Sequence, residues 1–343
     1  MSAPLAAPPA EPRRARTSFW FPSMPLGRIA ALRLVAYVFV LLDMVWWTPW
    51  VRPHREVPEF YRPLAVGRLL HLPTPTPLVV DAVAVALVVA AVAGVGLTLA
   101  AGRVRAGWPH VVAGTAVAVL YGEWMVVAMS YGKVDHDRFA LLVLLAVTAT
   151  VGRARLGERR SSEAAGWAIR CVQVAVVATY FLAAIAKFRY GGLGWVNGST
   201  LVWAIVRRGT ALGEPLLHVP ELLHVTQWGI VAMELATPLL LVAEHLRRTG
   251  RPSWRTPAAR FVALYLWGLV AFHVMTFAAI SILFLPHVVC LLAFAPLERA
   301  GAWRSRVVER ARALSRVRPR PGPAGPASVP AAPAAPASAR RSA

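Results

Sequence analysis

The sequence predicts an all-α protein, a polytopic bundle of about eight transmembrane helices. Hydrophobic residues occupy 57% of the 343 positions and the mean hydropathy is +0.54, whereas a soluble domain is roughly 45–50% apolar. They gather into long uncharged runs, which are typical of membrane-spanning helices. The formal net charge of +21 falls between and beyond these runs. This combination argues against a soluble enzyme, a disulfide scaffold, a disordered protein and a nucleic-acid binder.

Eight apolar runs are the candidate spans. They cover residues 29–48, 78–101, 109–130, 138–152, 166–187, 222–243, 258–279 and 281–297. The fourth is short for a bilayer crossing, which takes roughly 20 residues, so it extends into its flanks or is half-buried. Only Ser281 and Pro286 separate the last two, which form either a tight hairpin or one span plus a re-entrant piece.

The arginines predict a cell-membrane protein with both termini in the cytoplasm. Basic residues are dense before the first run, in alternate loops and after residue 298, and such residues favour the cytoplasmic side. An even number of spans places both basic ends there. The sequence thus predicts a disordered basic tail over residues 1–27, a membrane domain over 28–298, and a basic, Pro/Ala-rich, largely disordered cytoplasmic tail over 299–343.

Lysine is rare in this chain. Of its 37 lysines and arginines, only Lys133 and Lys187 are lysines. Lys187 ends the fifth predicted span and shares a helix face with Tyr180, Ala183 and Ala184. Two interpretations stay open. The side chain either snorkels to the external interface or is a desolvated amine that can lose its proton, as an arginine cannot.

Other polar residues lie at membrane depth, where a charge costs roughly 2.5–3.5 kcal/mol. Glu123 and Glu234 are interpreted as counter-ions for Arg33 or as neutral acids. His136, at the entry to the fourth span, is either a solvated loop residue or part of a site. The remaining polar residues at this depth are Asp43, His273 and His287. Cys171 and Cys290 fall in apolar runs, and no spacing typical of metal ligands appears.

The segment from Tyr180 to Gly198, YFLAAIAKFRYGGLGWVNG, resembles a signature of the HTTM domain. That domain is the multi-span membrane part of vitamin K-dependent γ-glutamyl carboxylase and its bacterial relatives. The shared pattern is an aromatic residue, small residues, a lysine that ends the helix, and then Trp and Gly. The stretch from Gly132 to His136 is similar to the family segment with a functional histidine. The resemblance covers residues 25–300, with Arg33, Glu234, His273 and Phe284-Leu285-Pro286 also fitting the family.

The resemblance implies a buried site for a reduced quinone, of the menaquinol or vitamin K hydroquinone type, and no metal. In the carboxylase the quinol is deprotonated and oxygenated, and the base formed on the way removes a γ-proton from glutamate before CO₂ adds. Lys187 is then the catalytic base, and His136 hydrogen-bonds the quinone oxyanion. The implied substrate- or quinone-binding residues are Tyr180, Trp195, Glu123, Glu234, His273 and Arg33.

Two functions stay open. The carboxylase has a large extracytoplasmic portion after its membrane domain, where this chain has a short basic segment, so carboxylation of a protein is in doubt. The first function is a γ-carboxylase-like membrane enzyme that modifies a small molecule or a secreted peptide. The second is a non-catalytic accessory or peptide-maturation protein of the sporulation-delaying protein B type, with Lys187 as a structural counter-ion. Both have membrane lipid and no nucleic acid as partner. A transporter is less favoured, because no inverted repeat is visible.

Overall fold

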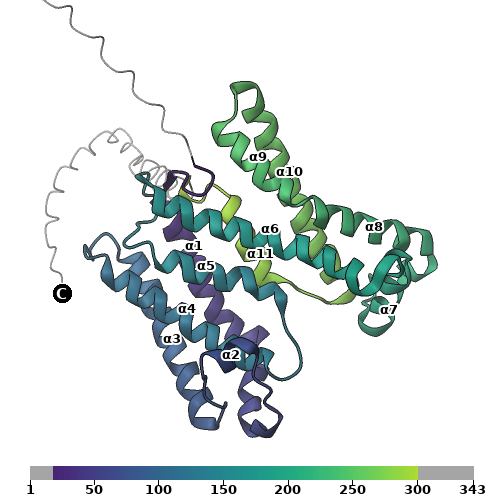
Figure 1. Ribbon diagram of the computed structural model, residues 1–343, viewed down its shortest axis with the longest axis horizontal. Helices are drawn as coiled ribbons and strands as arrows, with labels where there is room; N and C mark the ends of the chain where they lie inside the picture. The colour runs from purple at the N-terminus through teal and green to yellow at the C-terminus, as the bar shows by residue number, and fades with distance from the viewer. Residues whose placement is uncertain (1–17, 300–343) are drawn as a thin grey trace, which may run out of the picture. The chain divides into compact units, whose positions relative to one another are not determined.

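The computed structural model describes residues 18–299, and regular structure there is almost entirely helical. Five of these helical segments are long and apolar enough to cross a membrane, and a bent pair makes a sixth. These segments are α1 (Leu26–Leu42) with the helical turn that continues it to Trp47, α3 (Pro77–Leu99), α4 (Trp108–Met129), α6 (Glu163–Gly191) with the turn that continues it to Val196, and α10 (Pro252–Ile280). The bent pair is α8 (Pro220–Ala236) and α9 (Pro238–Thr249), which meet at an angle of 45°. An almost entirely helical fold with five or six apolar segments that could span a membrane is therefore confirmed for the part of the chain described (Figure 1).

The remaining elements are short. They are α2 (Ala65–Leu69), α5 (Phe139–Ala149), α7 (Ser199–Arg208), α11 (Leu285–Leu291), the π-helical turn η1 (Asp43–Trp47), the 3₁₀ turns η2 (Pro49–Glu56), η3 (Pro58–Phe60), η4 (His136–Arg138), η5 (Gly192–Val196), η6 (Glu214–His218) and η7 (Leu292–Phe294), and the strands β1 (Met24–Pro25) and β2 (Ser161–Ser162).

Two of the eight predicted spans are short helices. The fourth is represented by α5 and the eighth by α11 with η7. At 1.5 Å per residue, 11 residues extend only about 16 Å, roughly half of the hydrocarbon core. The predicted break between the seventh and eighth spans is present. There α10 ends at Ile280, Ser281 adopts a left-handed conformation with φ 55°, and α11 begins at Leu285.

The two short helices α5 and α11 pack against the long helices of the bundle. α5 packs against α4, α6, α1 and α11, and α11 also packs against α6, as Figure 1 shows for α5, α6 and α11. The inner faces are apolar: Leu141, Leu144 and Leu145 of α5 are fully buried. Surrounding protein therefore covers the inner faces of these two elements, and such cover allows helix ends at membrane depth.

Regular structure begins before residue 28. β1 pairs in an antiparallel manner with β2, and Met24 is fully buried. The preceding segment packs tightly on α6, where a Cβ at Gly166 would collide with the carbonyl oxygen of Pro22. Regular structure thus begins a few residues before the predicted start of the membrane domain. The rest of the predicted tails, residues 1–17 and 300–343, lies outside the described residues.

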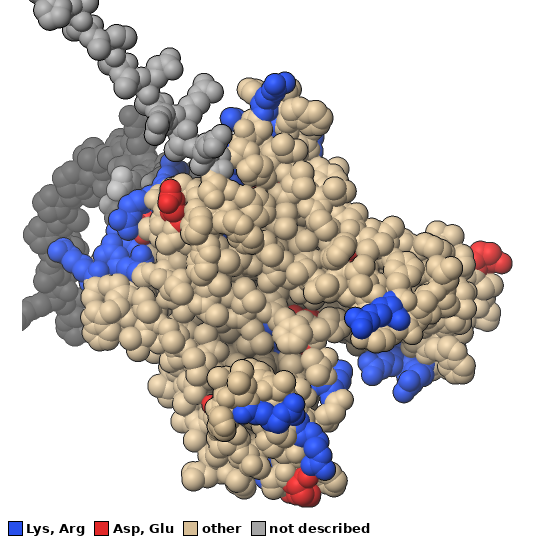
Figure 2. Space-filling view, in the orientation of Figure 1, with Lys and Arg blue, Asp and Glu red and all other residues tan. Residues whose placement is uncertain are grey.

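Much of the helical surface carries no charged side chains. Figure 2 shows a broad uncharged area, with lysines and arginines mainly near its edges. Large apolar side chains are exposed along α3 and α10, among them Leu78, Val85, Leu264 and Trp267. An uncharged surface with exposed apolar side chains is expected of helices in contact with lipid.

The start of α1 and the end of the described chain are joined by an ion pair. The guanidinium of Arg28 donates two hydrogen bonds of 3.0 Å to the carboxylate of Glu298. Both side chains are largely buried. The first and last predicted spans therefore have their outer ends on the same side of the bundle.

This ion pair predicts acid sensitivity. Burial raises the pKa of Glu298, but the hydrogen bonds and charge of Arg28 lower it more, so the pKa lies below its usual 4.5. A carboxyl whose pKa is lowered by folding stabilises the fold above its ordinary pKa, and this stabilisation is lost as the pH falls through the folded value. We expect the melting temperature of the wild type to decrease when the pH is lowered below 4.5. In Glu298→Gln this decrease should be smaller. Thermal melts of both proteins at several pH values measure this difference. Identical pH profiles for the wild type and Glu298→Gln would contradict the prediction.

Candidate functional site

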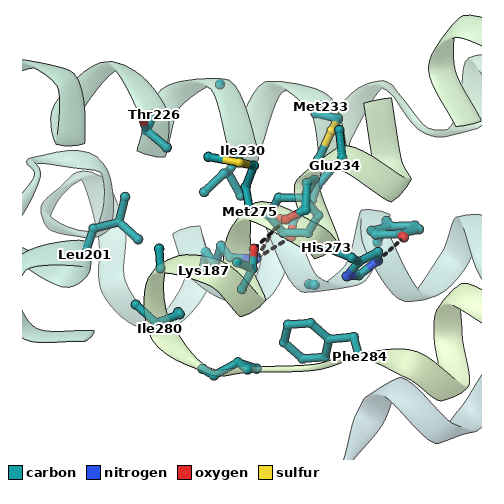
Figure 3. A pocket seen from close by; sticks show the side chains of 18 of the residues that line it. Lys187, Leu201, Thr226, Ile230, Met233, Glu234, His273, Met275, Ile280 and Phe284 are labelled. Carbon is teal, nitrogen blue, oxygen red and sulfur yellow. Dashed lines mark hydrogen bonds and ion pairs between the residues drawn. The ribbon is translucent and has the colours of Figure 1, made fainter. Parts of the chain in front are cut away.

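Lys187 points into the protein and pairs with Glu234. Its ammonium group lies 2.6 and 2.7 Å from the two carboxylate oxygens of Glu234 (Figure 3). The same nitrogen lies 5.1 Å from the centre of the Trp195 ring, within reach of a cation–π interaction. The Lys187 side chain is 20% exposed and that of Glu234 is 5% exposed. Of the two sequence interpretations of Lys187, snorkelling to the interface is thus not the observed arrangement.

Proline positions the partner carboxylate. Pro238 has no N–H, so the carbonyl of Glu234, four residues earlier, loses its helical donor. The Thr237 hydroxyl replaces that donor at 2.7 Å. The bend between α8 and α9 follows at this point. Glu234 therefore lies in the last turn of α8, where its side chain reaches Lys187 on α6.

A cavity of about 850 Å³ opens beside the ion pair. Lys187, Tyr180 and Ala183 of one α6 face line it, as their helical spacing predicts, whereas Ala184 packs in a buried cluster with Val196 and Val231. α8 and α10 supply most of the other walls, with further residues from α7, η4, η6, α11 and the segment before α11. Most of the lining is apolar, and the polar members are His136, Asp137, Thr179, Tyr180, Lys187, Trp195, Thr226, Glu234, His273, Thr276 and His287.

Three aromatic side chains form the wall beyond the ion pair. The Tyr180 hydroxyl and His273 Nε2 are 2.6 Å apart, and the rings of Tyr180 and His287 meet edge to face at 4.5 Å. His273 Nδ1 and both ring nitrogens of His287 are buried without a hydrogen-bond partner among the described residues. Each unmade hydrogen bond of a buried group costs about 1–3 kcal/mol, so these three nitrogens are unsatisfied polar atoms in residues that line the cavity.

His136 lies at the mouth of this cavity. It is exposed and comes from η4, and its ring centre is 6.3 Å from that of Phe284. A second cavity of about 780 Å³ lies along α5 and α6, and His136, Lys187 and Trp195 line both cavities. The polar residues named by the sequence motif therefore stand where two apolar cavities meet.

Two predicted site residues lie elsewhere. Arg33 is 1% exposed, and its guanidinium donates to the carbonyl oxygens of Thr148, Val151 and Gly152 at the end of α5. Glu123 lies on α4, and neither residue lines the cavity. Arg33 pairs with backbone carbonyls, so Glu123 and Glu234 are not its counter-ions in this structure, which was one of the two interpretations of these acids. An arginine can satisfy several backbone carbonyls at once, so it need not face a carboxylate.

A buried network that sequence reasoning left out of the site holds the His136 segment. Both carboxylate oxygens of Asp43 are used: one accepts from Arg138 at 3.1 Å and the other from Tyr121 at 2.9 Å. Thr48 links this cluster to the indole of Trp124. Asp43 lies in the π-helical turn η1, and such turns are frequent at functional sites. The available signals in the sequence were the position of Arg138, two residues after His136, and the presence of Asp43 at membrane depth.

His287 is a second omission. It is 2% exposed and lines the cavity next to His273. The sequence placed it at membrane depth but offered no reason to prefer it to a core histidine. Within residues 18–299 no group of three or more His, Cys, Asp or Glu side chains has a geometry suited to a metal ion. No family model, curated protein or solved structure matches the chain.

Proposed function

We propose that this chain is a multi-pass membrane protein that binds a reduced quinone in the 850 Å³ cavity and uses Lys187 as its acid–base group. The observation that carries the proposal is the convergence of Lys187, Glu234, His136 and His273 on one apolar cavity. Binding sites for small molecules have volumes of about 300–1,000 Å³ and combine apolar walls with a few polar groups. The function is that of a γ-carboxylase-like enzyme acting on a small molecule or a secreted peptide.

The lining is suited to a quinone. A flat, apolar ring with an oxygen at each end needs apolar walls and a small number of hydrogen-bonding groups. His273 and His287, which line the cavity and have unpartnered ring nitrogens, supply such groups, and Lys187 is another polar residue of the lining. A bound quinol supplies an acidic ring hydroxyl and two electrons for an acceptor.

The protein's own residues would hold and move the proton. The Lys187–Glu234 pair can exist as ammonium and carboxylate or, after one proton moves, as amine and carboxylic acid. Closing an apolar ligand over the pair excludes water and favours the uncharged form, because isolated charges are costly in a low dielectric. An uncharged Lys187 can then accept a proton. His136, at the cavity mouth, would donate a hydrogen bond to a developing oxyanion.

A second function is favoured by the ion pair itself. Lys187 is already held by two short hydrogen bonds to Glu234, which is the arrangement of a structural counter-ion. In that case the protein is a non-catalytic accessory, such as a partner in maturation of a secreted peptide. The two functions differ in whether arginine can replace Lys187, because arginine preserves the ion pair but not the removable proton.

We further propose eight crossings of the cell membrane with both described ends cytoplasmic. The Arg28–Glu298 pair supports an even number of crossings. α5 and α11 would cross together with the non-helical residues beside them, and both helices pack against α6. The arginines in alternate loops support the cytoplasmic assignment of these ends.

The experiment that tests the quinone proposal begins with the purified protein. Mass spectrometry of co-purifying lipids, and titration with menaquinone-4, should detect a bound quinone. With menaquinol-4 and oxygen, the wild type should oxidise the quinol, and Lys187→Arg should lose this activity at least about a hundredfold while still binding menaquinone-4. Lys133→Arg, at the other lysine, is the matched control and should retain activity.

Each other result selects a different conclusion. Full activity of Lys187→Arg would overturn the base role and favour a structural counter-ion. Binding without turnover in the wild type would favour the accessory function. The absence of quinone binding would overturn the quinone proposal.

A further inference from the structure

The wall of the cavity between α8 and α10 is incomplete. α8 packs against α6, and α10 packs against α9, but α8 and α10 do not pack closely on one another. Residues of both helices line the cavity and are nevertheless exposed, with Val225 65% and Met275 63% exposed. The cavity is therefore open to the surroundings between these helices.

This opening, here called the α8–α10 window, is closed at both ends. At one end the Tyr265 hydroxyl donates to the carbonyl oxygen of Met233. At the other end Leu223 of α8 and Ile280 of α10 form a buried cluster with Ile205 of α7. Figure 3 shows Thr226 and Ile230 on the α8 side, with Met275 and Ile280 on α10. α8 and α10 are thus in contact at both ends of the window and separated between them.

Two glycines border the window. Gly229 on α8 and Gly268 on α10 both line the cavity and are exposed, and a Cβ added at either would meet no atom within 4 Å. Gly268 lies near the middle of the 29-residue helix α10. In a membrane this depth is hydrocarbon, so the window faces lipid chains rather than water.

The polar and apolar parts of the cavity are separated. The Lys187–Glu234 pair, His273 and His287 lie inside, whereas the exposed window residues include Val225, Thr226, Gly229, Gly268, Ala271 and Met275. A ligand that fits this arrangement has a polar head and a hydrocarbon tail. Its head would contact the polar groups, and its tail would pass outward into the lipid. An apolar tail is favourably placed there because it is not in contact with water.

We infer that the ligand is a tailed quinone, that it enters from the bilayer through the α8–α10 window, and that its isoprenoid tail stays in that window. This inference rests on the proposed quinone site and adds the tail, the route and the residues that border it. A ring without a tail binds the inner cavity and makes no contact with Gly229 or Gly268.

The test narrows the window and compares two probes with the same ring. Gly229→Phe/Gly268→Phe places two large side chains in open space. Menaquinone-4 carries an isoprenoid tail and menadione carries none. Binding of each probe to the purified protein is measured by quenching of tryptophan fluorescence. We expect the double variant to bind menaquinone-4 at least about tenfold more weakly and menadione as the wild type does.

Controls separate narrowing from misfolding. Gly96 is an exposed glycine of α3 with the same open space around its Cβ position, and Gly96→Phe should bind both probes normally. Gly229→Ala/Gly268→Ala should also bind both. If the Phe double variant bound both probes equally more weakly, or bound both as the wild type does, the proposed role of the window would be overturned. Wild-type binding of menadione but not menaquinone-4 would overturn the tail while keeping the quinone site. Wild-type binding of neither would overturn the proposed function and this inference with it.

Discussion

Replacing Lys187 by methionine is expected to lower the free energy of unfolding by about 3 kcal/mol or more. The substitution leaves the Glu234 carboxylate, whose side chain is 5% exposed, without the ammonium group that neutralises it. An unpaired buried charge costs more than the pair contributes when it is intact. Thermal unfolding in detergent, followed by circular dichroism, measures the loss.

The double variant Lys187→Met/Glu234→Gln is the decisive control. It removes both charges, so most of the lost stability should return, and a double-mutant cycle then gives the coupling between the two residues. Lys133→Met provides the matched single change. Lys133 is 75% exposed in its pair with Asp135, and such a pair contributes about 0–1 kcal/mol. A Lys187→Met protein as stable as the Lys133→Met protein would show that the ion pair does not stabilise the fold.

The second large effect is expected at Asp43. Asp43→Leu leaves Arg138 without its closest carboxylate and Tyr121 without its acceptor, and all three side chains are buried. We expect a loss of about 3–5 kcal/mol. Because Arg138 ends the turn that carries His136, residues 131–138 should also exchange their amide hydrogens faster. Hydrogen exchange with mass spectrometry and thermal melts measure both effects.

The exposed pair of Arg55 and Asp81 is the comparison for Asp43. Its atoms are closer, at 2.5 Å, but its side chains are 32% and 51% exposed. Asp81→Leu should therefore cost only about 0–1 kcal/mol. If Asp43→Leu were as mild and left exchange in residues 131–138 unchanged, the buried network would not be what holds His136 at the cavity.

Helical periodicity predicted the α6 side of the site correctly. Tyr180, Ala183 and Lys187 line one cavity because residues three and four apart share a helix face. The partner of Lys187 could not be predicted in this way. Glu234 lies 47 positions later, and the choice between it and Glu123 depends on which helix face meets α6.

The partners of Arg33 could not be predicted for a similar reason. Its charge and depth suggested an acidic partner or a ligand, but α5 is short and ends inside the bundle. The carbonyls at that end need donors, and Arg33 supplies them. The length of α5 was itself uncertain from the sequence, because an apolar run shows where a helix can form and not where the chain turns.

Composition and spacing by themselves determined that this protein is helical, that several of its helices are apolar enough to cross a membrane, and which polar residues lie among them. Hydrophobicity and helical period are local properties, so a single sequence carries them. The tertiary structure alone decided that Lys187 meets Glu234, that Asp43 meets Arg138, that α5 and α11 are short and buried, and that α8 and α10 leave a window. These features depend on the rotation, crossing and bending of helices far apart in the chain, which follow from packing the whole bundle at once.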